Sequence, residues 1–422
     1  MRNIGIIILL VLCLTLLLLT CCMINSGKPE LVSGNLENQE NINQSSNNSQ
    51  SSSTSPVEEP IEEDTKATGT VYPQKWATGD GTVENPWAND CIQKAYDFVP
   101  AGGTVFLKSG YYTLSTSIEI NKEVNIVGEG RNKTIIKTSS ANGILISHDN
   151  CTLKGFTIDG DSQLDGTQYL SPISLSNCNY ALLEEIEVKN AGYYGINIFQ
   201  VNYSLFQNIH AHDNYRHGIH PGSDTVGRNK YNTYRDIYAW NNGSGGFDDR
   251  GSSVYPNEQM DNVYDNIQCW DNGHFGIAIA CQKGGVLSNS FANSNGESGI
   301  WMQNIEDFNV HDCSTTLNGK EGIQILISDN VNLTNIIVKN NYNGISLAVC
   351  SDITLTSCQS YDDRETPLQA YGIALTRVNG KISLFNCVLT PNQYGEIYNP
   401  YGAVITVITE KREASPSVIV SK

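Results

Sequence analysis

The chain has 422 residues, of which only 17% are charged and 9% aromatic, and it carries 37 glycines. Its 44 acidic residues outnumber 26 basic ones, and the formal net charge is -18 at pH 7. Such a chain lacks the basic surface with which proteins neutralise nucleic-acid phosphates, so we expect no nucleic-acid partner. Few charges and many turn-forming residues also favour an all-β fold over a helical one.

Residues 1–24 have the pattern of an export signal, in which a basic start precedes an apolar core. The apolar run over residues 4–19 ends at Cys21 and Cys22. Three interpretations stay open: a lipoprotein lipidated on Cys21 or Cys22, a retained membrane anchor, and simple secretion. All three place the rest of the chain outside the cytoplasm. We therefore expect an extracellular, cell-surface protein, tethered to the membrane through its N-terminus.

Residues 25–70 are dominated by Asn, Gln, Ser and Glu. Such a segment cannot bury enough apolar surface to offset the conformational entropy lost on ordering. We therefore predict a disordered tether over residues 25–70, a folded body over residues 71–410 and a C-terminal tail over residues 411–422.

A unit of 22 to 23 residues, with occasional insertions, repeats through the body. A glycine followed by an apolar residue marks the units, at Gly195, Gly218, Gly246, Gly276, Gly299, Gly322, Gly344 and Gly372. Four residues before a repeat glycine stands Asn214, Asn242, Asn272, Asn295, Asn318 or Asn340. Asparagine tolerates turn conformations, so we predict that these side chains stack in successive coils and pair amide to amide.

Apolar and polar residues alternate within each unit, as in Ile300-Trp301-Met302-Gln303. This period of two indicates half-buried strands. Several strands in about 22 residues leave no room for crossover helices, so the pattern predicts a solenoid of parallel strands with about eleven coils. Residues 90–99 are amphipathic and begin with Asp90, which predicts a short N-terminal capping helix.

Two segments after this helix, Pro100-Ala-Gly-Gly-Thr-Val and Val124-Asn-Ile-Val-Gly-Glu-Gly, resemble the opening of right-handed parallel β-helix proteins of the pectin-lyase-like group. The resemblance covers about residues 75–410 and implies a single-stranded right-handed parallel β-helix. It implies no single reaction, because that group holds lyases, hydrolases, epimerases and non-enzymatic proteins.

Polar residues gather on the face that alternation assigns to solvent. Adjacent coils lie about 4.8 Å apart, so positions one before, two after and four after the repeat glycine form columns. Three consecutive coils place there Tyr194, Asn197, His217, His220, Asp248 and Arg250, flanked by Arg216, His274, Trp270 and Trp301. We predict an exposed groove at this place, with a shared function for His217, His220, Asp248 and Arg250.

The segments Asn214-Tyr-Arg-His-Gly-Ile and Asp236 to Gly251 resemble the β-helix of mannuronan C5-epimerases and related polysaccharide lyases. The resemblance implies substrate or catalytic roles for Arg216 and His217. That family has a catalytic Asp-Pro-His segment after a Tyr-Gly. Here Tyr194-Gly195 is followed by Asn197 and Phe199 instead, and His220-Pro221-Gly222 stands one coil later.

Lyases and epimerases of uronic acids both begin by removing the C5 proton, which requires a neutralised carboxylate. Arg216 or Arg250 would bind the carboxylate, and His217 or His220 would be the base. Tyr194 would return the proton, and Asp248 would orient a histidine. The expected substrate-binding residues are Arg216, Asn197, His274, Trp301 and Gln303. We expect a monomer that acts on an acidic, uronate-containing polysaccharide.

Two alternatives and one cofactor stay open. Asp248 and Asp249 are candidates to hold Ca²⁺ between the acidic protein and its polymer. They are also candidates for the two carboxylates of a polygalacturonase-type glycoside hydrolase. A β-helix without catalysis, which binds carbohydrate or serves as a structural element of the cell surface, is the second alternative.

Nine cysteines follow the export signal, without metal-ligand spacing. We expect them to be small core residues, with Cys350 and Cys358 as the first pair to test for a disulfide bond. Sequons for N-glycosylation begin at Asn132, Asn150, Asn202, Asn242 and Asn332.

Overall fold

The computed structural model describes residues 69–138, 143–160, 171–222, 229–251, 259–378, 380–409 and 417–419. The expected export signal with Cys21 and Cys22, and the tether up to residue 68, lie outside the described residues. Asp64–Lys422 forms one compact unit. In the described part of the chain, no helix is both long enough and apolar enough to cross a membrane.

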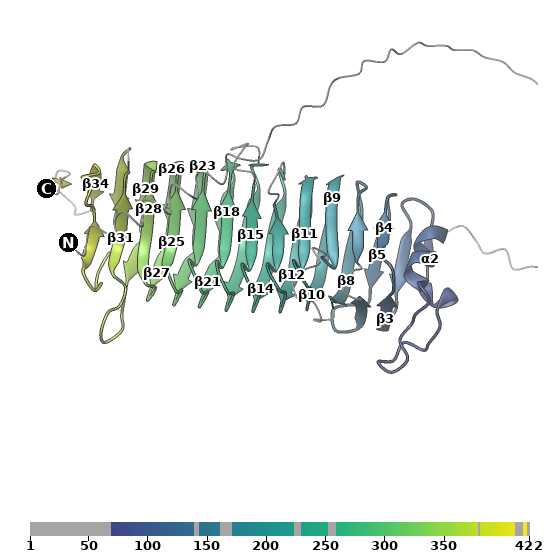
Figure 1. Cartoon of the computed structure of the whole chain (residues 1–422). Coiled ribbons are helices and arrows are strands. Elements are labelled where there is room, and N and C mark those ends of the chain that lie inside the picture. The colour runs from purple at the N-terminus through teal and green to yellow at the C-terminus, as the bar shows by residue number, and fades with distance from the viewer. Residues whose placement is uncertain are drawn as a thin grey trace, which may run out of the picture. The chain divides into compact units, whose positions relative to one another are not determined.

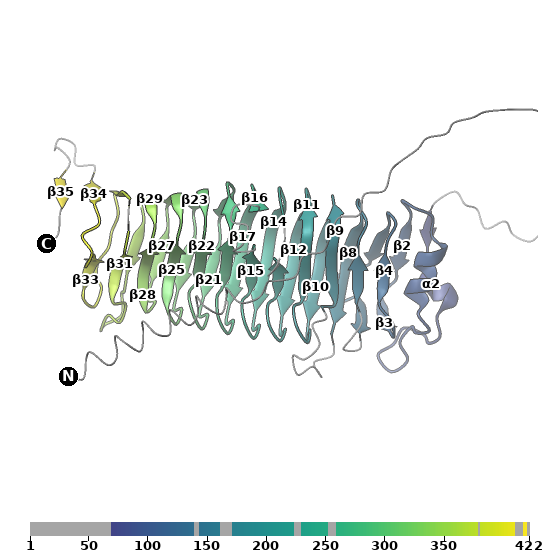
Figure 2. The same cartoon turned by 45° about the horizontal axis from the view of Figure 1, so that its top comes forward.

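The described strands wind into a parallel β-helix (Figure 1, Figure 2). One wall is a 12-stranded sheet to which each coil gives one strand. Its strands are β4 (Ile118–Ile120), β7 (Ile144–Ile146), β9 (Ile173–Asn179), β11 (Ile196–Asn202), β13 (Ile219–Pro221), β15 (Phe247–Arg250), β18 (Ile277–Ala280), β22 (Ile300–Gln303), β25 (Glu321–Leu326), β28 (Asn343–Ala348), β31 (Tyr371–Thr376) and β33 (Gly395–Tyr398). The prediction of about eleven coils is therefore close.

The remaining strands form a 23-stranded sheet around the rest of the coil. They are β1 (Thr70–Val71), β2 (Thr104–Leu107), β3 (Gly110–Leu114), β5 (Asn125–Gly128), β6 (Thr134–Thr138), β8 (Thr152–Asp159), β10 (Leu182–Lys189), β12 (Leu205–His212), β14 (Thr233–Trp240), β16 (Gln259–Met260), β17 (Val263–Trp270), β19 (Gln282–Lys283), β20 (Val286–Ser288), β21 (Phe291–Asn293), β23 (Glu306–His311), β24 (Ser314–Thr316), β26 (Asp329–Thr334), β27 (Ile337–Lys339), β29 (Ser351–Thr356), β30 (Gln359–Tyr361), β32 (Ile382–Phe385), β34 (Ile405–Ile408) and β35 (Ser417–Ile419). Only β35 pairs antiparallel among the described strand pairs, against β34.

The N-terminal end of the core is closed by α2 (Cys91–Phe98), preceded by the 3₁₀ helix η1 (Pro73–Trp76). Figure 1 shows α2 at one end of the stack and β34 near the other. The predicted capping helix is confirmed, and Asp90 stands at its N-cap position. The Asp90 carboxylate does not cap the helix, because it accepts a hydrogen bond from the Ser115 hydroxyl instead.

Buried asparagines run along the turns as predicted, and we call them the asparagine ladder. Each side-chain amide donates to the amide oxygen of the next, through Asn214, Asn242, Asn272, Asn295, Asn318 and Asn341, at 2.9 to 3.0 Å. The prediction that Asn340 belongs to the ladder is wrong. It has a φ of 57° and bonds to Asp363, because this unit has one residue fewer between its asparagine and its glycine.

The ladder explains why the repeat position must be glycine. A Cβ added at Gly276 would lie 2.7 Å from the Asn295 side-chain nitrogen, and one at Gly299 would lie 2.6 Å from that of Asn318. The sequon at Asn242 also falls in the ladder, where this residue is 2% exposed. The expectation of a glycan there is therefore wrong for the folded chain.

The nine cysteines from Cys91 to Cys387 all have free thiols, and eight are buried, as core residues should be. The disulfide considered between Cys350 and Cys358 is absent. The Cys350 thiol donates instead to the carbonyls of Ile325 and Ala348.

Candidate functional site

Three of the expected site residues form a compact group on two neighbouring coils, which we call the histidine cluster: His217, His220 and Asp248. His220 lies on β13 and Asp248 on β15. These strands are adjacent, with Ile219 opposite Phe247. His220 and Asp248, the next residues of the two strands, therefore lie side by side on neighbouring coils. The repeat phase therefore brings these residues together as predicted.

The histidine cluster is buried, whereas we expected an exposed groove. His217 is 1% exposed, His220 5% and Asp248 0%. The Tyr194 ring covers both imidazoles, with ring centroids 5.2 Å from His217 and 4.2 Å from His220. The expectation of an exposed groove at these residues is therefore wrong. The alternation of apolar and polar residues predicts which side chains point away from the core. It does not predict that the Tyr194 ring packs on them.

Hydrogen bonds fix the cluster from several sides. The Gly245 amide donates to Nδ1 of His217 at 2.9 Å, and this nitrogen lies 3.2 Å from Oδ2 of Asp248. Nδ1 of His220 bonds to the backbone carbonyl of Asp248 at 3.0 Å. Nε of the half-buried Arg250 donates to Oδ1 of Asp248. His217 and Arg250 thus contact the carboxylate of Asp248, whereas His220 bonds to its backbone carbonyl.

The protonation states follow from burial and charge. Burial lowers the pKa of His217 to about 3, against the opposing effect of Asp248, so this imidazole is neutral at pH 7. Burial opposes ionisation of Asp248, whereas the charge and the hydrogen bond of Arg250 favour it, and the pKa of this carboxyl lies below its ordinary value. The cluster therefore combines a neutral histidine with a carboxylate.

Asp249 faces the opposite side of β15, into the core. Its Oδ2 accepts a hydrogen bond from the Tyr264 hydroxyl at 2.6 Å, and burial raises the pKa of Asp249 to about 8. Neighbouring residues of a strand point to opposite faces. Asp248 and Asp249 therefore cannot share one ion, and the expected calcium pair is wrong.

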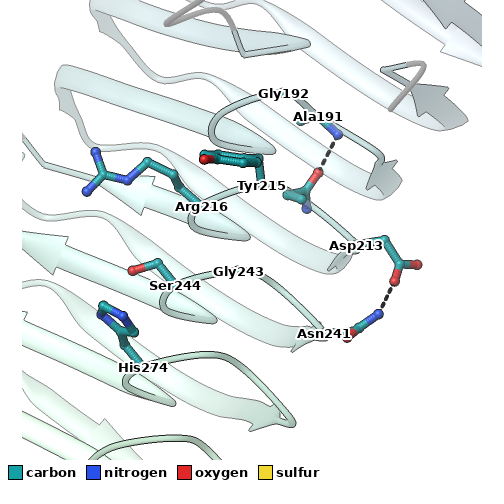
Figure 3. Close-up of a pocket in the computed structure, with 10 residues that line it drawn as sticks. Ala191, Gly192, Asp213, Tyr215, Arg216, Asn241, Gly243, Ser244 and His274 are labelled. Atoms are coloured by element: carbon teal, nitrogen blue, oxygen red, sulfur yellow. Dashed lines mark hydrogen bonds between the residues drawn. The ribbon is translucent and has the colours of Figure 1, made fainter. Parts of the chain in front are cut away.

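An open cleft of about 620 Å³ adjoins the cluster on the turns between coils. Figure 3 shows Arg216, Ser244 and His274 one above the other along its wall. Backbone hydrogen bonds from Ser244 to Arg216 and from His274 to Ser244 stack these three residues on successive coils. The expected substrate residues Arg216 and His274 therefore line one cleft, with exposed His274 at one end.

Arg216 connects the cleft to the histidine cluster. Its guanidinium lies 5.0 Å from the ring centroid of Tyr193 and 5.9 Å from that of Tyr194, and it donates to the Tyr193 hydroxyl. Tyr193 and the cleft residues Tyr215 and Ser244 were not among the site residues expected from the sequence. Two features of the sequence could have indicated them. Tyr193 belongs to a Tyr-Tyr pair directly before the repeat glycine Gly195, and Ser244 occupies the position of Arg216 in the next coil.

The other expected substrate residues lie at the edge of this site. Asn197 is half-buried, directly opposite His220 in the sheet. Trp301 and Gln303 lie on β22, two coils beyond Asp248 and Arg250, with the small residues Ala278 and Ala280 between. The Trp301 ring stacks on Phe275 at 5.2 Å. The structure therefore separates Trp301 and Gln303 from the histidine cluster.

Comparison with known proteins defines the fold. A family model described as a right handed beta helix region matches residues 252–409. The fold is a right-handed parallel β-helix. No curated protein matches the chain in sequence.

Solved structures share this fold at low sequence identity. The A-module of Azotobacter vinelandii mannuronan C-5 epimerase AlgE4 has a TM-score of 0.66 and 16% identity, over 80% of this chain and 99% of that module. The AlgE6 A-module gives 0.64 and 17%, over 81% and 100%. The catalytic unit of a GH87 alpha-1,3-glucanase from Streptomyces thermodiastaticus gives 0.52 and 13%, over 84% and 70%. The β-helix predicted from the opening segments is confirmed.

Proposed function

We propose that this protein acts on an acidic, uronate-containing polysaccharide by removing the C5 proton, as a lyase or a C5-epimerase. The observation that carries the proposal is the position of Arg216, which lines the cleft and lies against the Tyr193 and Tyr194 rings. A guanidinium binds a carboxylate through two parallel hydrogen bonds. Neutralising that carboxylate is what makes the C5 proton acidic.

Tyr194 is the residue that we place at the reacting carbon. Its half-buried side chain lies between Arg216 and the histidine cluster, and a phenol is a general acid or base in enzymes. His217 and His220 are too buried to reach a polymer directly. We therefore assign them to positioning Tyr194, on whose ring both imidazoles pack.

The neighbouring structures support this choice in part. The two mannuronan C-5 epimerase modules share the fold over nearly their full length. The hydrolase alternative has the glucanase as a structural neighbour, but it needs two carboxylates at one site, and Asp249 faces the core. Asn197 and Phe199 replace the expected Asp and His, so product analysis must decide between elimination and inversion. We further propose that the protein works at the cell surface, tethered through its N-terminus.

The test is an activity screen on polymannuronate, polyguluronate, polygalacturonate and a neutral alpha-1,3-glucan. Incubation in D₂O followed by NMR reports exchange at C5, and ultraviolet absorbance reports the unsaturated ends of elimination. We expect C5 exchange on at least one polyuronate and none on the glucan. New reducing ends without exchange or unsaturation would support the hydrolase, and binding without any reaction would support the non-catalytic alternative.

Matched variants locate the activity. Arg216→Gln and Tyr194→Phe should each lower kcat/KM on the active polymer by a factor of about 100 or more. Arg235→Gln and Tyr203→Phe are the controls, because both side chains are exposed on other parts of the β-helix. Full activity of Arg216→Gln would refute the proposed site.

A further inference from the structure

Two cysteines stand opposite each other on neighbouring coils in the C-terminal part of the β-helix. Gln359 in β30 and Val388 on the next coil are paired in parallel, and the Val388 amide donates to the Cys358 carbonyl at 2.9 Å. Cys358 and Cys387, which directly precede the two paired residues, are therefore neighbours across the coils. We propose that Cys358 and Cys387 are a redox-active pair, which an external low-molecular-weight disulfide converts into a disulfide bond between coils.

The hydrogen bonds of the two thiols show that they occupy the same place on successive coils. Each thiol donates to two backbone carbonyls at 3.5 Å. The acceptors are Leu333 and Thr356 for Cys358, and Leu355 and Phe385 for Cys387. The acceptors of one thiol are paired in the parallel sheet with those of the other. The two sulfur atoms therefore lie one coil apart, in equivalent surroundings.

The spacing of the coils suits a disulfide bond. Adjacent strands lie about 4.8 Å apart, and the Cα atoms of bonded cysteines are usually about 4.4 to 6.8 Å apart. The bond therefore forms when the two side chains rotate from their carbonyl acceptors toward each other, with little movement of the backbone.

Position selects Cys387 as the partner of Cys358. Cys313 belongs to the same column of residues, but Ile336 stands between Cys313 and Cys358, as the backbone hydrogen bonds of these coils show. Cys350 precedes β29, whereas Cys358 follows it, so the length of this strand separates them. The disulfide considered from the sequence thus named one correct cysteine and the wrong partner.

Cys387 is the accessible member of the pair. Of the nine cysteines in the described part of the chain, it is the one that is not buried. A hydrogen bond from the Cys358 thiol lowers the pKa of Cys387, whereas burial raises the pKa of Cys313 to about 12. The thiolate is the form that attacks a disulfide, so an external disulfide should react first at Cys387.

The reaction consists of two thiol–disulfide exchanges. The Cys387 thiolate attacks one sulfur of an external disulfide such as oxidised glutathione, and one glutathione thiolate leaves. The Cys358 thiol loses its proton to solvent, and its thiolate attacks the Cys387 sulfur and expels the second glutathione. Two protein thiols are thus oxidised, while one external disulfide is reduced to two thiols. The product persists in oxidising surroundings such as the cell surface, where we propose that the protein works.

The bond ties the last coils together. It closes the chain between Cys358 and Cys387, which contains β31 and β32. The described residues at this end include no helix comparable to α2, so contact between neighbouring coils must hold them. A cross-link restricts the unfolded chain, and the oxidised protein should therefore melt at a higher temperature than the reduced protein.

The test uses the full chain, reduced and then incubated in its folded state with oxidised glutathione. Mass spectrometry of peptides, after alkylation of the free thiols, should find a Cys358–Cys387 cross-link. Cys387→Ala should abolish it, whereas Cys313→Ala and Cys350→Ala should retain it. The thermal midpoint of the wild type should rise on oxidation and return with a reductant, and that of Cys387→Ala should not respond.

Three outcomes would overturn the proposal. The first is a folded wild type without the cross-link, including one that carries glutathione on Cys387. The second is a cross-link of Cys358 to Cys313 or Cys350, and the third is a Cys358–Cys387 bond that forms only in urea, because the folded coils must bring the pair together. Circular dichroism must show an intact β-helix in each variant. No readout involves a polymer, so this result and that of the activity screen are independent.

Discussion

Asp249 is a carboxyl group inside the β-helix, fully buried beside the Tyr264 hydroxyl and the Gln282 amide. Its pKa is raised from 3.8 to about 8, because burial opposes the charged form. Asp248, its neighbour on the other face, is also buried, but its pKa is lowered, because Arg250 favours its charged form by its charge and its hydrogen bond. Two adjacent residues of one type thus reach opposite protonation states at pH 7.

The raised pKa of Asp249 predicts a pH-dependent stability. Between about pH 4 and pH 8, the native state keeps a proton that the unfolded chain releases, so the free energy of unfolding falls as the pH rises. Asp249→Asn has no such proton. In thermal melts, the stability of this variant relative to wild type should therefore increase across this window, by an amount on the order of a few kcal/mol.

Asp363→Asn is the control for this pH series, because Asp363 is an exposed carboxyl group whose pKa is lowered by Lys339. If wild type and Asp249→Asn lose stability in parallel from pH 4 to pH 8, Asp249 is ionised in the native state and the assignment fails.

At the scale of the elements, the asparagine ladder depends on the repeat glycine. The ladder satisfies backbone and side-chain groups in the turns, and the glycine leaves room for the amide of the next coil. The sequence spacing predicted this pairing for five members. It failed at Asn340, because counting back from a glycine assumes a constant turn length. Hydrogen bonding selects Asn341 instead.

Breaking one ladder position should destabilise the whole β-helix. In Asn295→Ala, the backbone amide and side-chain amide of Asn272 lose their common acceptor, and the Cys269 carbonyl loses a donor. These groups are buried, so we expect a loss of at least about 2 kcal/mol in urea unfolding. Asn309→Ala, at an exposed position of β23, should change stability by less than about 0.5 kcal/mol.

The glycine should be equally sensitive. In Gly276→Ala, the new methyl group would lie 2.7 Å from both the Asn295 amide nitrogen and the Gly299 carbonyl. We expect a loss of about 1 to 3 kcal/mol from this overpacking. Gly395→Ala is not a suitable control, because its φ is 141°. Gln359→Ala, at an exposed position of β30, should be nearly neutral, and an equally stable Gly276→Ala would contradict the role of the glycine.

At the scale of the whole molecule, Asp64–Lys422 forms one compact unit. The β-helix closes its N-terminal end with α2, whose buried residues Cys91, Ile92 and Ala95 belong to the core. Each coil packs on the next, so stability depends on contact between neighbours and on covered ends.

This arrangement predicts how truncations behave. A chain that begins at residue 64 should show the same thermal midpoint as the full chain, because its compact unit is complete. A chain that begins at residue 103 lacks α2 and uncovers the first coil. It should melt at a lower temperature and aggregate through its exposed apolar end. Equal midpoints for both truncations, measured by circular dichroism with light scattering, would contradict a capping role for α2.

The sequence by itself determined the β-helix, the number of coils to within about one, the capping helix and which residues meet on neighbouring coils. It could do so because strand alternation and repeat length are local properties, and stacking converts them directly into contacts. Only the tertiary structure decided how far each outward residue is covered. The Tyr194 ring packs on His217 and His220. Arg216 lies over the Tyr193 ring, and a cleft opens on the turns. These features depend on side-chain size and direction across coils, which the period of the sequence does not encode.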